Sequence, residues 1–153
     1  RCGVSQPSGL GVMLCMLGDN AEHANAWTAA IGKTIASLAL VEAPGAPSGV
    51  FEDRLVLRFT DGTGVALCDM GRRCCESRYL RTDDDLAYYV GAELRGAQVL
   101  DAPDVDMGDG DGAHEVSFLH VETDRGTFTA SAHNEHNGYY DGFSIQCVAL
   151  EAA

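Results

Sequence analysis

The chain has 153 residues, of which 46% are hydrophobic and 22% charged, a composition that predicts one soluble globular domain with its own core. Ten lysines and arginines face 23 aspartates and glutamates, so the net charge is −13. This charge repels phosphate backbones and argues against nucleic-acid binding, and no stretch approaches the roughly 20 apolar residues of a membrane span.

Six cysteines are too few to indicate a disulfide framework in a chain of this length. Two of them, Cys74 and Cys75, are adjacent, where a mutual disulfide is strained. We therefore expect a reducing compartment and a cytoplasmic protein.

Hydrophobic patterning predicts the elements of the first half. Leu55, Leu57 and Phe59 alternate with arginines, which is typical of a half-buried strand, and Asp61-Gly62 is a strong hairpin signal. The expected elements are a strand over Leu10–Leu17, a helix near Asn20–Ile31, and strands over Thr34–Val41, Arg54–Thr60 and Val65–Asp69.

In the second half, Thr82 is expected to cap a helix whose first turn is rich in aspartate, and Gly91 to end it. The acidic stretch Asp101–Gly112 predicts a solvated loop. The expected elements are a helix near Asp83–Val90 and strands over Glu93–Leu100, Glu115–Glu122, Thr127–Ala132 and Phe143–Leu150. The fold class is therefore α+β, dominated by antiparallel strands.

The chain also matches itself at a constant offset of 59 residues. The stretch from Ile31 to Pro44 aligns with the stretch from Val90 to Pro103, and a hairpin follows each of them. We interpret this as an internal duplication within a single domain over residues 1–153. Residues 1–30 form an N-terminal extension, and residues 31–89 and 90–150 form two similar halves that build a sandwich or open barrel.

Two segments carry an unusual density of reactive and ligand-binding side chains. The first packs arginines beside two cysteines, and the second combines histidines, asparagines and paired tyrosines. The candidate ligand-binding residues are Arg72, Arg73, Cys74, Cys75, Glu76, Arg78, Tyr79, His133, Asn134, Glu135, His136, Asn137, Tyr139 and Tyr140.

Several runs together resemble a family of small phage and bacterial proteins known only as a domain of unknown function. They are Cys74–Tyr79, Thr82–Leu86, Phe118–Val121, Gly126–Thr129 and His133–Phe143. The resemblance spans about Ile31 to Leu150, and Asp141 stands where the family pattern has a glycine. It implies no activity that could be transferred to this chain.

Three kinds of chemistry suit the two segments. His133, His136 and the thiols of Cys74 and Cys75 could bind zinc, although their spacing is no standard zinc pattern. A cysteine beside arginines could be a nucleophile, with His114, His120, His133 or His136 as its base. Arginines, tyrosines and asparagines could instead recognise a ligand.

The absence of a catalytic motif favours ligand recognition. The leading hypothesis is a non-enzymatic intracellular binding protein of phage or bacterial origin. We expect its partner to be a small anionic or nucleotide-like ligand or another protein. We expect no cofactor and no binding to nucleic acid or membranes. The sequence leaves the oligomeric state open. The alternative is a Cys/His metal-dependent or thiol enzyme.

Overall fold

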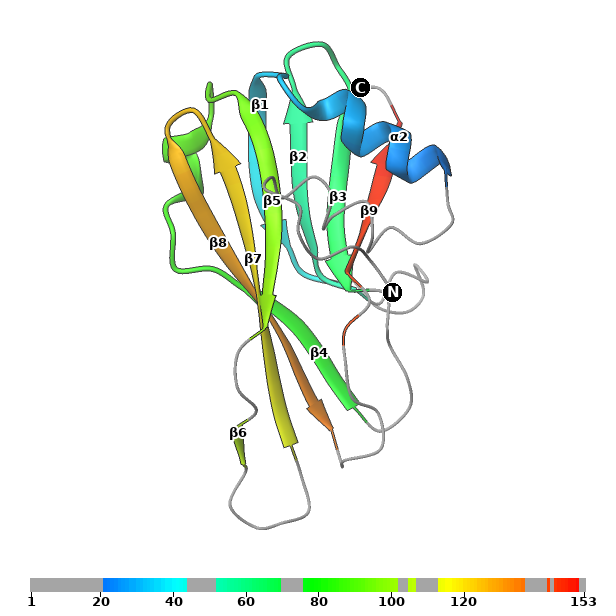
Figure 1. Ribbon diagram of the computed structural model, residues 1–153, viewed down its shortest axis with the longest axis vertical. Coiled ribbons are helices and arrows are strands. Elements are labelled where there is room, and N and C mark those ends of the chain that lie inside the picture. The colour runs from blue at the N-terminus through cyan, green and yellow to red at the C-terminus, as the bar shows by residue number, and fades with distance from the viewer. Residues whose placement is uncertain are drawn as a thin grey trace.

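A computed structural model describes residues 21–43, 52–69, 76–101, 105–106, 113–136, 143 and 145–151. Within them, two open antiparallel sheets face each other (Figure 1). The elements are α2 (Ala21–Ala30), β1 (Ile35–Val41), β2 (Arg54–Phe59), β3 (Gly64–Asp69), β4 (Glu76–Arg81), the 3₁₀ turn η1 (Leu86–Tyr89), β5 (Leu94–Asp101), β6 (Val105–Asp106), β7 (Ala113–Thr123), β8 (Gly126–His136) and β9 (Ile145–Leu150). The predicted dominance of antiparallel strands is confirmed.

The first sheet has the strand order β1-β2-β3-β9 and the second has the order β4-β8-β7-β5, with the short β6 paired to β7. The hairpins at Asp61-Gly62 and Asp124-Arg125 join β2 to β3 and β7 to β8, as the turn signals predict. In each sheet three strands are close in the chain, and the fourth comes from elsewhere. β4 follows the first hairpin but joins the second sheet, and β9 ends the chain but joins the first sheet.

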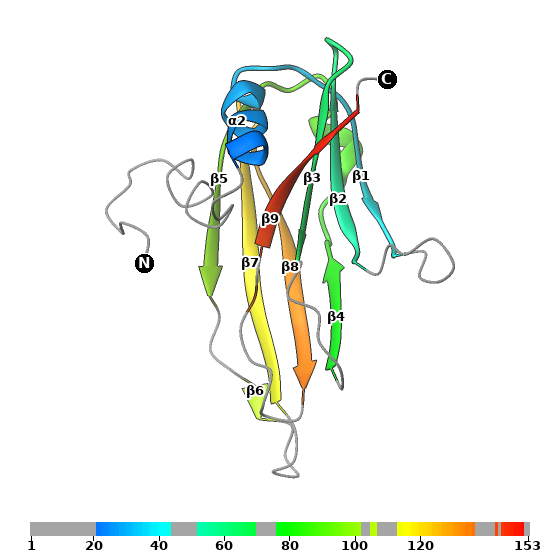
Figure 2. The same ribbon diagram turned by 90° about the vertical axis from the view of Figure 1, so that its right-hand side faces the viewer.

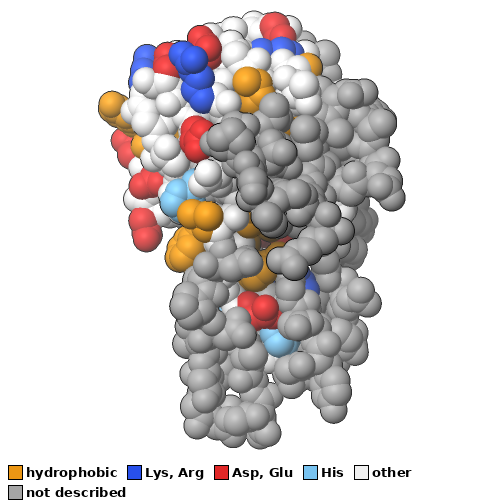
Figure 3. All heavy atoms as spheres, viewed as in Figure 1, with side chains coloured by type: hydrophobic (Ala, Val, Ile, Leu, Met, Phe, Trp, Pro, Cys, Tyr) orange, Lys and Arg blue, Asp and Glu red, His pale blue; other side chains and the backbone are white. Residues whose placement is uncertain are grey.

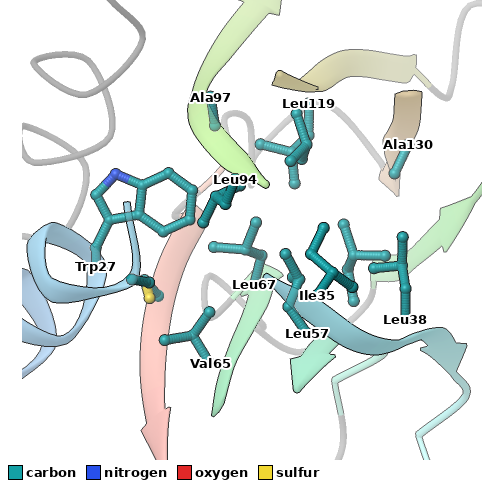
Figure 4. Packing of buried hydrophobic residues seen from close by; sticks show 14 of the residues in the cluster. Trp27, Ile35, Leu38, Leu57, Val65, Leu67, Leu94, Ala97, Leu119 and Ala130 are labelled. Carbon is teal, nitrogen blue, oxygen red and sulfur yellow. The ribbon is translucent and has the colours of Figure 1, made fainter. Parts of the chain in front are cut away.

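The main hydrophobic core lies between the upper parts of the two sheets (Figure 4). The first sheet contributes the predicted inward residues Leu55, Leu57 and Phe59, all buried. Helix α2 lies beside β9 and β3 at one open side of the two layers (Figure 2). Its Trp27 is fully buried and reaches Leu94 of β5, so the helix closes this side of the core.

The two sheets are joined where β1 and β5 begin. Gly32 and Gly91, with φ of 90° and 93°, let the chain turn from the preceding helical segment into the strand. Four backbone hydrogen bonds then form two pairs, and the members of each pair are related by the offset of 59. In the first pair, Gly32 N donates to Leu94 O and Gly91 N donates to Ile35 O, both at 2.8 Å. In the second pair, Ile35 N donates to Ala92 O at 2.8 Å and Leu94 N donates to Lys33 O at 2.9 Å. A register irregularity also follows each junction, at Ile35/Ser37 and at Leu94/Gly96.

The prediction of a helix near Asp83–Val90 is wrong, because only the four-residue 3₁₀ turn η1 forms there. Residues before it are tied to β8 instead. Thr82 Oγ1 donates to Thr129 O at 2.8 Å, and Asp84 Oδ2 accepts from Thr129 N at 2.6 Å. Too few residues then remain before the left-handed Gly91 for an α-helix, and the described chain holds little helix besides α2.

The sequence also misses β4 and ends β8 too early, at Ala132 instead of His136. Both stretches carry polar side chains on both faces, so they lack the alternation of apolar and polar residues that predicts a strand. The expected strand over Leu10–Leu17 lies outside the described residues, and β6 falls within the expected acidic loop. None of the described helices is both long and apolar enough to span a membrane.

Candidate functional site

The described parts of the two unusual segments lie side by side, because β4 and β8 are antiparallel neighbours. Tyr79 is opposite His133, Arg78 is opposite Asn134, and Glu76 is opposite His136. Side chains alternate between the two faces of a strand, so the candidate residues divide into an inner and an outer group.

The inner group forms a buried polar cluster below the apolar core. Arg78 Nη1 donates to Asp69 Oδ2 of β3 at 2.8 Å, and the two side chains are only 8% and 6% exposed. His136 Nε2 lies 2.6 Å from Glu115 Oε1, and Asn134 is fully buried. The Arg78–Asp69 ion pair therefore connects the two sheets, and this arginine faces the interior.

The outer group is built around two stacked rings. The rings of Tyr79 and His133 are nearly parallel, with centroids 4.7 Å apart, and the Arg81 guanidinium lies 4.6 Å from the centre of the Tyr79 ring. Tyr79 OH donates to Glu135 Oε2 at 2.6 Å. Partial burial, followed by the hydrogen bond to Glu135, raises the pKa of Tyr79, so its hydroxyl stays protonated and the rings are held in place.

The two ring nitrogens of His133 connect its own strand, β8, to β7, and its ring stacks on Tyr79 of β4. Its Nε2 is 2.8 Å from Ser131 Oγ on the same strand, and its Nδ1 is 2.9 Å from His114 Nε2 on β7. Partial burial lowers the pKa of His133, and the neighbouring His114 and Arg81 add to this, so its neutral form is favoured. We call this set the outer cluster: Tyr79, Arg81, His114, Ser131, His133 and Glu135.

A surface depression of about 200 Å³ adjoins the outer cluster. It is lined by Arg81, Thr82, Asp83, Asp84, Phe118, Thr129 and Ser131. Arg81 and Ser131 therefore belong to both features. The depression offers one aromatic ring, a cation, two carboxylates and several hydroxyls to an occupant.

On the face seen in Figure 3, the acidic side chains of the described residues are spread out and not gathered in one patch. On this face the net charge of −13 therefore marks no acidic binding patch.

Sequence reasoning identifies Tyr79, His133 and Glu135 but not Arg81 or Ser131. A signal for Ser131 is present, because Ser131, His133 and Glu135 follow at intervals of two and would share one face of a strand. Reading His133–Tyr140 as a loop hides this alternation.

Other predicted site residues lie outside the described residues: Arg72, Arg73, Cys74, Cys75, Asn137, Tyr139 and Tyr140. For Glu76 only the backbone is described. The described cysteines, Cys68 and Cys147, are buried in neighbouring strands without a disulfide between them. Burial raises the pKa of the Cys68 thiol to about 11 and that of Cys147 to about 12, so neither is an activated nucleophile. In the described part of the chain, no three His, Cys, Asp or Glu side chains are grouped to hold a metal ion.

Comparison with known proteins confirms that the chain contains a domain of unknown function. Residues 28–145 match the model of a domain of unknown function, DUF7448. Neither curated proteins nor solved structures give a match. The matched region contains all of the outer cluster and the depression. The chain belongs to the DUF7448 family.

Proposed function

We propose that the protein binds a small planar polar ligand in the depression beside the outer cluster. The observation that carries this proposal is the lining, in which the Phe118 ring, the Arg81 guanidinium and the carboxylates of Asp83 and Asp84 surround about 200 Å³. Pockets for drug-sized ligands measure about 300–1,000 Å³. The depression therefore suits one ring system better than a whole nucleotide.

The mixed charge of the lining supports a particular ligand class. A purely anionic ligand would meet Arg81 but also the carboxylates of Asp83 and Asp84. A nucleobase-like heterocycle has hydrogen-bond donors and acceptors on its edge and a flat face that can stack on Phe118. We therefore favour a nucleobase-like ring over a phosphorylated anion. A cytoplasmic location and a phage or bacterial origin stay predictions.

A thermal-shift and calorimetric panel of nucleobases, nucleosides and nucleotides tests this proposal. We expect a nucleobase or nucleoside to raise Tm, because a ligand that binds only the folded state stabilises it. Phe118→Ala should weaken binding about tenfold or more, since stacking a base on an aromatic ring contributes about 1–3 kcal/mol. Arg95→Ala, an exposed change on β5 that lines no part of the depression, should bind like the unmodified protein.

Two results would contradict the small-ligand proposal. One is that no compound of the panel raises Tm, and the other is that Phe118→Ala binds as tightly as the unmodified protein. Either result would favour the other predicted partner, a protein.

We further propose that the chain consists of two duplicated halves, residues 31–89 and 90–150. The paired hydrogen bonds at Gly32 and Gly91 support this, because they are related by the same offset of 59 as the sequence match. The corresponding strand orders of the two sheets support it as well. A duplication at this offset would give equivalent places to the segments that follow the two hairpins, Gly71–Tyr79 and His133–Tyr140, but their described parts are not related in that way. β4 and β8 are paired neighbours, and β9 occupies in the first sheet the place that β4 has in the second.

A further inference from the structure

We propose that Ser131, His133 and His114 form a nucleophilic relay at the wall of the depression, with which the protein hydrolyses small carboxylic esters. Ser131 is the nucleophile, His133 is its general base, and His114 is a positioning residue. This inference rests on the depression of the proposed function and goes beyond it, because it assigns the depression a catalytic role, with carboxylic esters as substrates, in place of the expected non-enzymatic role.

The geometry of the relay is that of a nucleophile, a base and an orienting group. Ser131 and His133 are two residues apart on β8, so their side chains share its outer face, and Oγ lies 2.8 Å from Nε2. The other nitrogen of the same ring, Nδ1, lies 2.9 Å from His114 Nε2. Both distances fall in the range of about 2.6–3.2 Å that such relays require.

The relay operates in one tautomer. His133 Nε2 can accept the Ser131 proton only when the ring proton is on Nδ1, from which it donates to His114 Nε2. His114 then has the role that a carboxylate has in a Ser-His-Asp triad, because it holds the base in this tautomer and orientation.

The base is further held by its surroundings. Tyr79 stacks on the His133 ring, and Glu135 and Arg81 contact Tyr79 in turn. The groups that act electrostatically on His133 are His114 from β7, Arg81 from β4 and Glu135 from β8. Burial lowers the pKa of His133 most, His114 and Arg81 lower it further, and Glu135 opposes them. The ring is therefore in its basic form near neutral pH.

The nucleophile is also accessible, since Ser131 and Arg81 both line the depression. In the first step Ser131 Oγ bonds to the carbonyl carbon of the ester while its proton passes to His133 Nε2. The Arg81 guanidinium is the nearby cation that can stabilise the oxyanion. The bond to the alcohol then breaks, and the departing oxygen takes the proton from His133.

In the second step a water molecule attacks the acyl group on Ser131 and gives a proton to His133. The carboxylic acid leaves, and the proton returns to Ser131. The net reaction converts one ester and one water into one acid and one alcohol, and the protein is regenerated.

The test uses the full chain and diisopropyl fluorophosphate, which bonds to an activated serine oxygen with loss of fluoride. We expect labelling at Ser131, located by peptide mass spectrometry and absent in Ser131→Ala. Ser77→Ala is the matched control, because Ser77 is exposed on the same face of the sheet but has no part in the relay. His133→Asn should slow labelling about 100-fold or more, the usual contribution of a general base.

The pH profile separates catalysis from a structural role. The labelling rate should rise with pH and reach its plateau with a midpoint below 6.5, the ordinary histidine value, since the pKa of His133 is lowered. His114→Asn should move this midpoint upward, because His114 is one of the groups that lower the pKa of His133. A midpoint that does not move would overturn the role of His114.

The relay itself is overturned if folded protein is not labelled, if another serine is labelled instead, or if His133→Asn is labelled at the unmodified rate. If Ser131→Ala does not fold, Ser131→Cys is used in its place. The thiol at position 131 should then react with iodoacetamide. Its reaction should be faster in Ser131→Cys than in the double variant Ser131→Cys/His133→Asn, which lacks the general base. Ligand binding is measured separately on the same samples. Binding without labelling overturns the relay alone, and labelling without any bound panel compound overturns the ligand proposal alone.

Discussion

Arg78 and Arg81 lie on the same strand, β4, in opposite environments. Arg78 is buried against Asp69 of the facing sheet, whereas Arg81 is exposed and lies over the Tyr79 ring. The same division separates Asn134, fully buried, from His133 beside it. One residue of register thus decides whether a polar side chain supports the interior or faces a possible ligand.

At the scale of single residues, we predict that breaking the buried Arg78–Asp69 ion pair lowers the free energy of unfolding strongly. Arg78→Met should lower the free energy of unfolding by about 3 kcal/mol or more, because it leaves the Asp69 carboxylate buried without its cation. Arg95→Met should cost less than about 1 kcal/mol, since its pair with Glu93 spans 3.5 Å between side chains 57% and 39% exposed. Urea denaturation measures both, and equal costs would contradict a connecting role for Arg78.

A second prediction concerns Asp61 in the first hairpin. The Lys33 ammonium, 2.8 Å away, and then Thr63 lower the pKa of this carboxyl below its ordinary value of 3.8. A lowered pKa in the folded state stabilises the fold above pH 3.8, and the contribution is lost as the pH falls further. The Tm difference between the unmodified protein and Asp61→Asn should therefore be constant near neutral pH and shrink in acid. A difference that grows in acid would contradict this.

Among the elements, α2 and β4 differ in how well local sequence indicates them. The helix predicted near Asn20–Ile31 is confirmed at Ala21–Ala30. β4 is missed because its residues are polar on both faces, and pairing with β8 defines it. The outer cluster exists only because of that pairing.

We predict that α2 is essential for the core. Trp27→Ala should cost about 3–5 kcal/mol, because it removes a fully buried ring from the side that the helix closes. Trp27→Phe should cost clearly less, since much of the buried area is kept. Trp27 is the single tryptophan of the chain, so its emission in the unmodified protein should be blue-shifted and move to the red on unfolding. A red emission in the folded protein would contradict the burial of Trp27.

For the whole molecule, the exchanged strands imply cooperative folding. β4 completes the second sheet and β9 completes the first, so neither half contains all the strands of one sheet. Trp27 fluorescence and far-UV circular dichroism should therefore report the same unfolding midpoint in urea. Residues 31–89 and 90–150 should each be unfolded when expressed alone. Two separate transitions, or a folded half, would contradict this coupling.

Local sequence determined the mainly antiparallel architecture, the two hairpins and the inward residues Leu55, Leu57 and Phe59. It also showed the similarity between two stretches of the chain that lie 59 residues apart. These features depend on the alternation of apolar residues and on turn chemistry, which act over a few neighbouring positions. Local sequence also drew attention to the segments that hold His133 and Tyr79.

Only the tertiary structure decided which strands complete each sheet and which polar residues meet. The pairing of β4 with β8 joins residues 50 to 60 positions apart, as in the Tyr79–Glu135 hydrogen bond. It depends on which sheet edge is free and on which side chains can be buried together, and a polar strand carries no local pattern for either. The contact of Ser131, His133 and His114 depends instead on the register of the β7–β8 hairpin, in which Phe118 is opposite Ser131 and His114 is opposite Glu135.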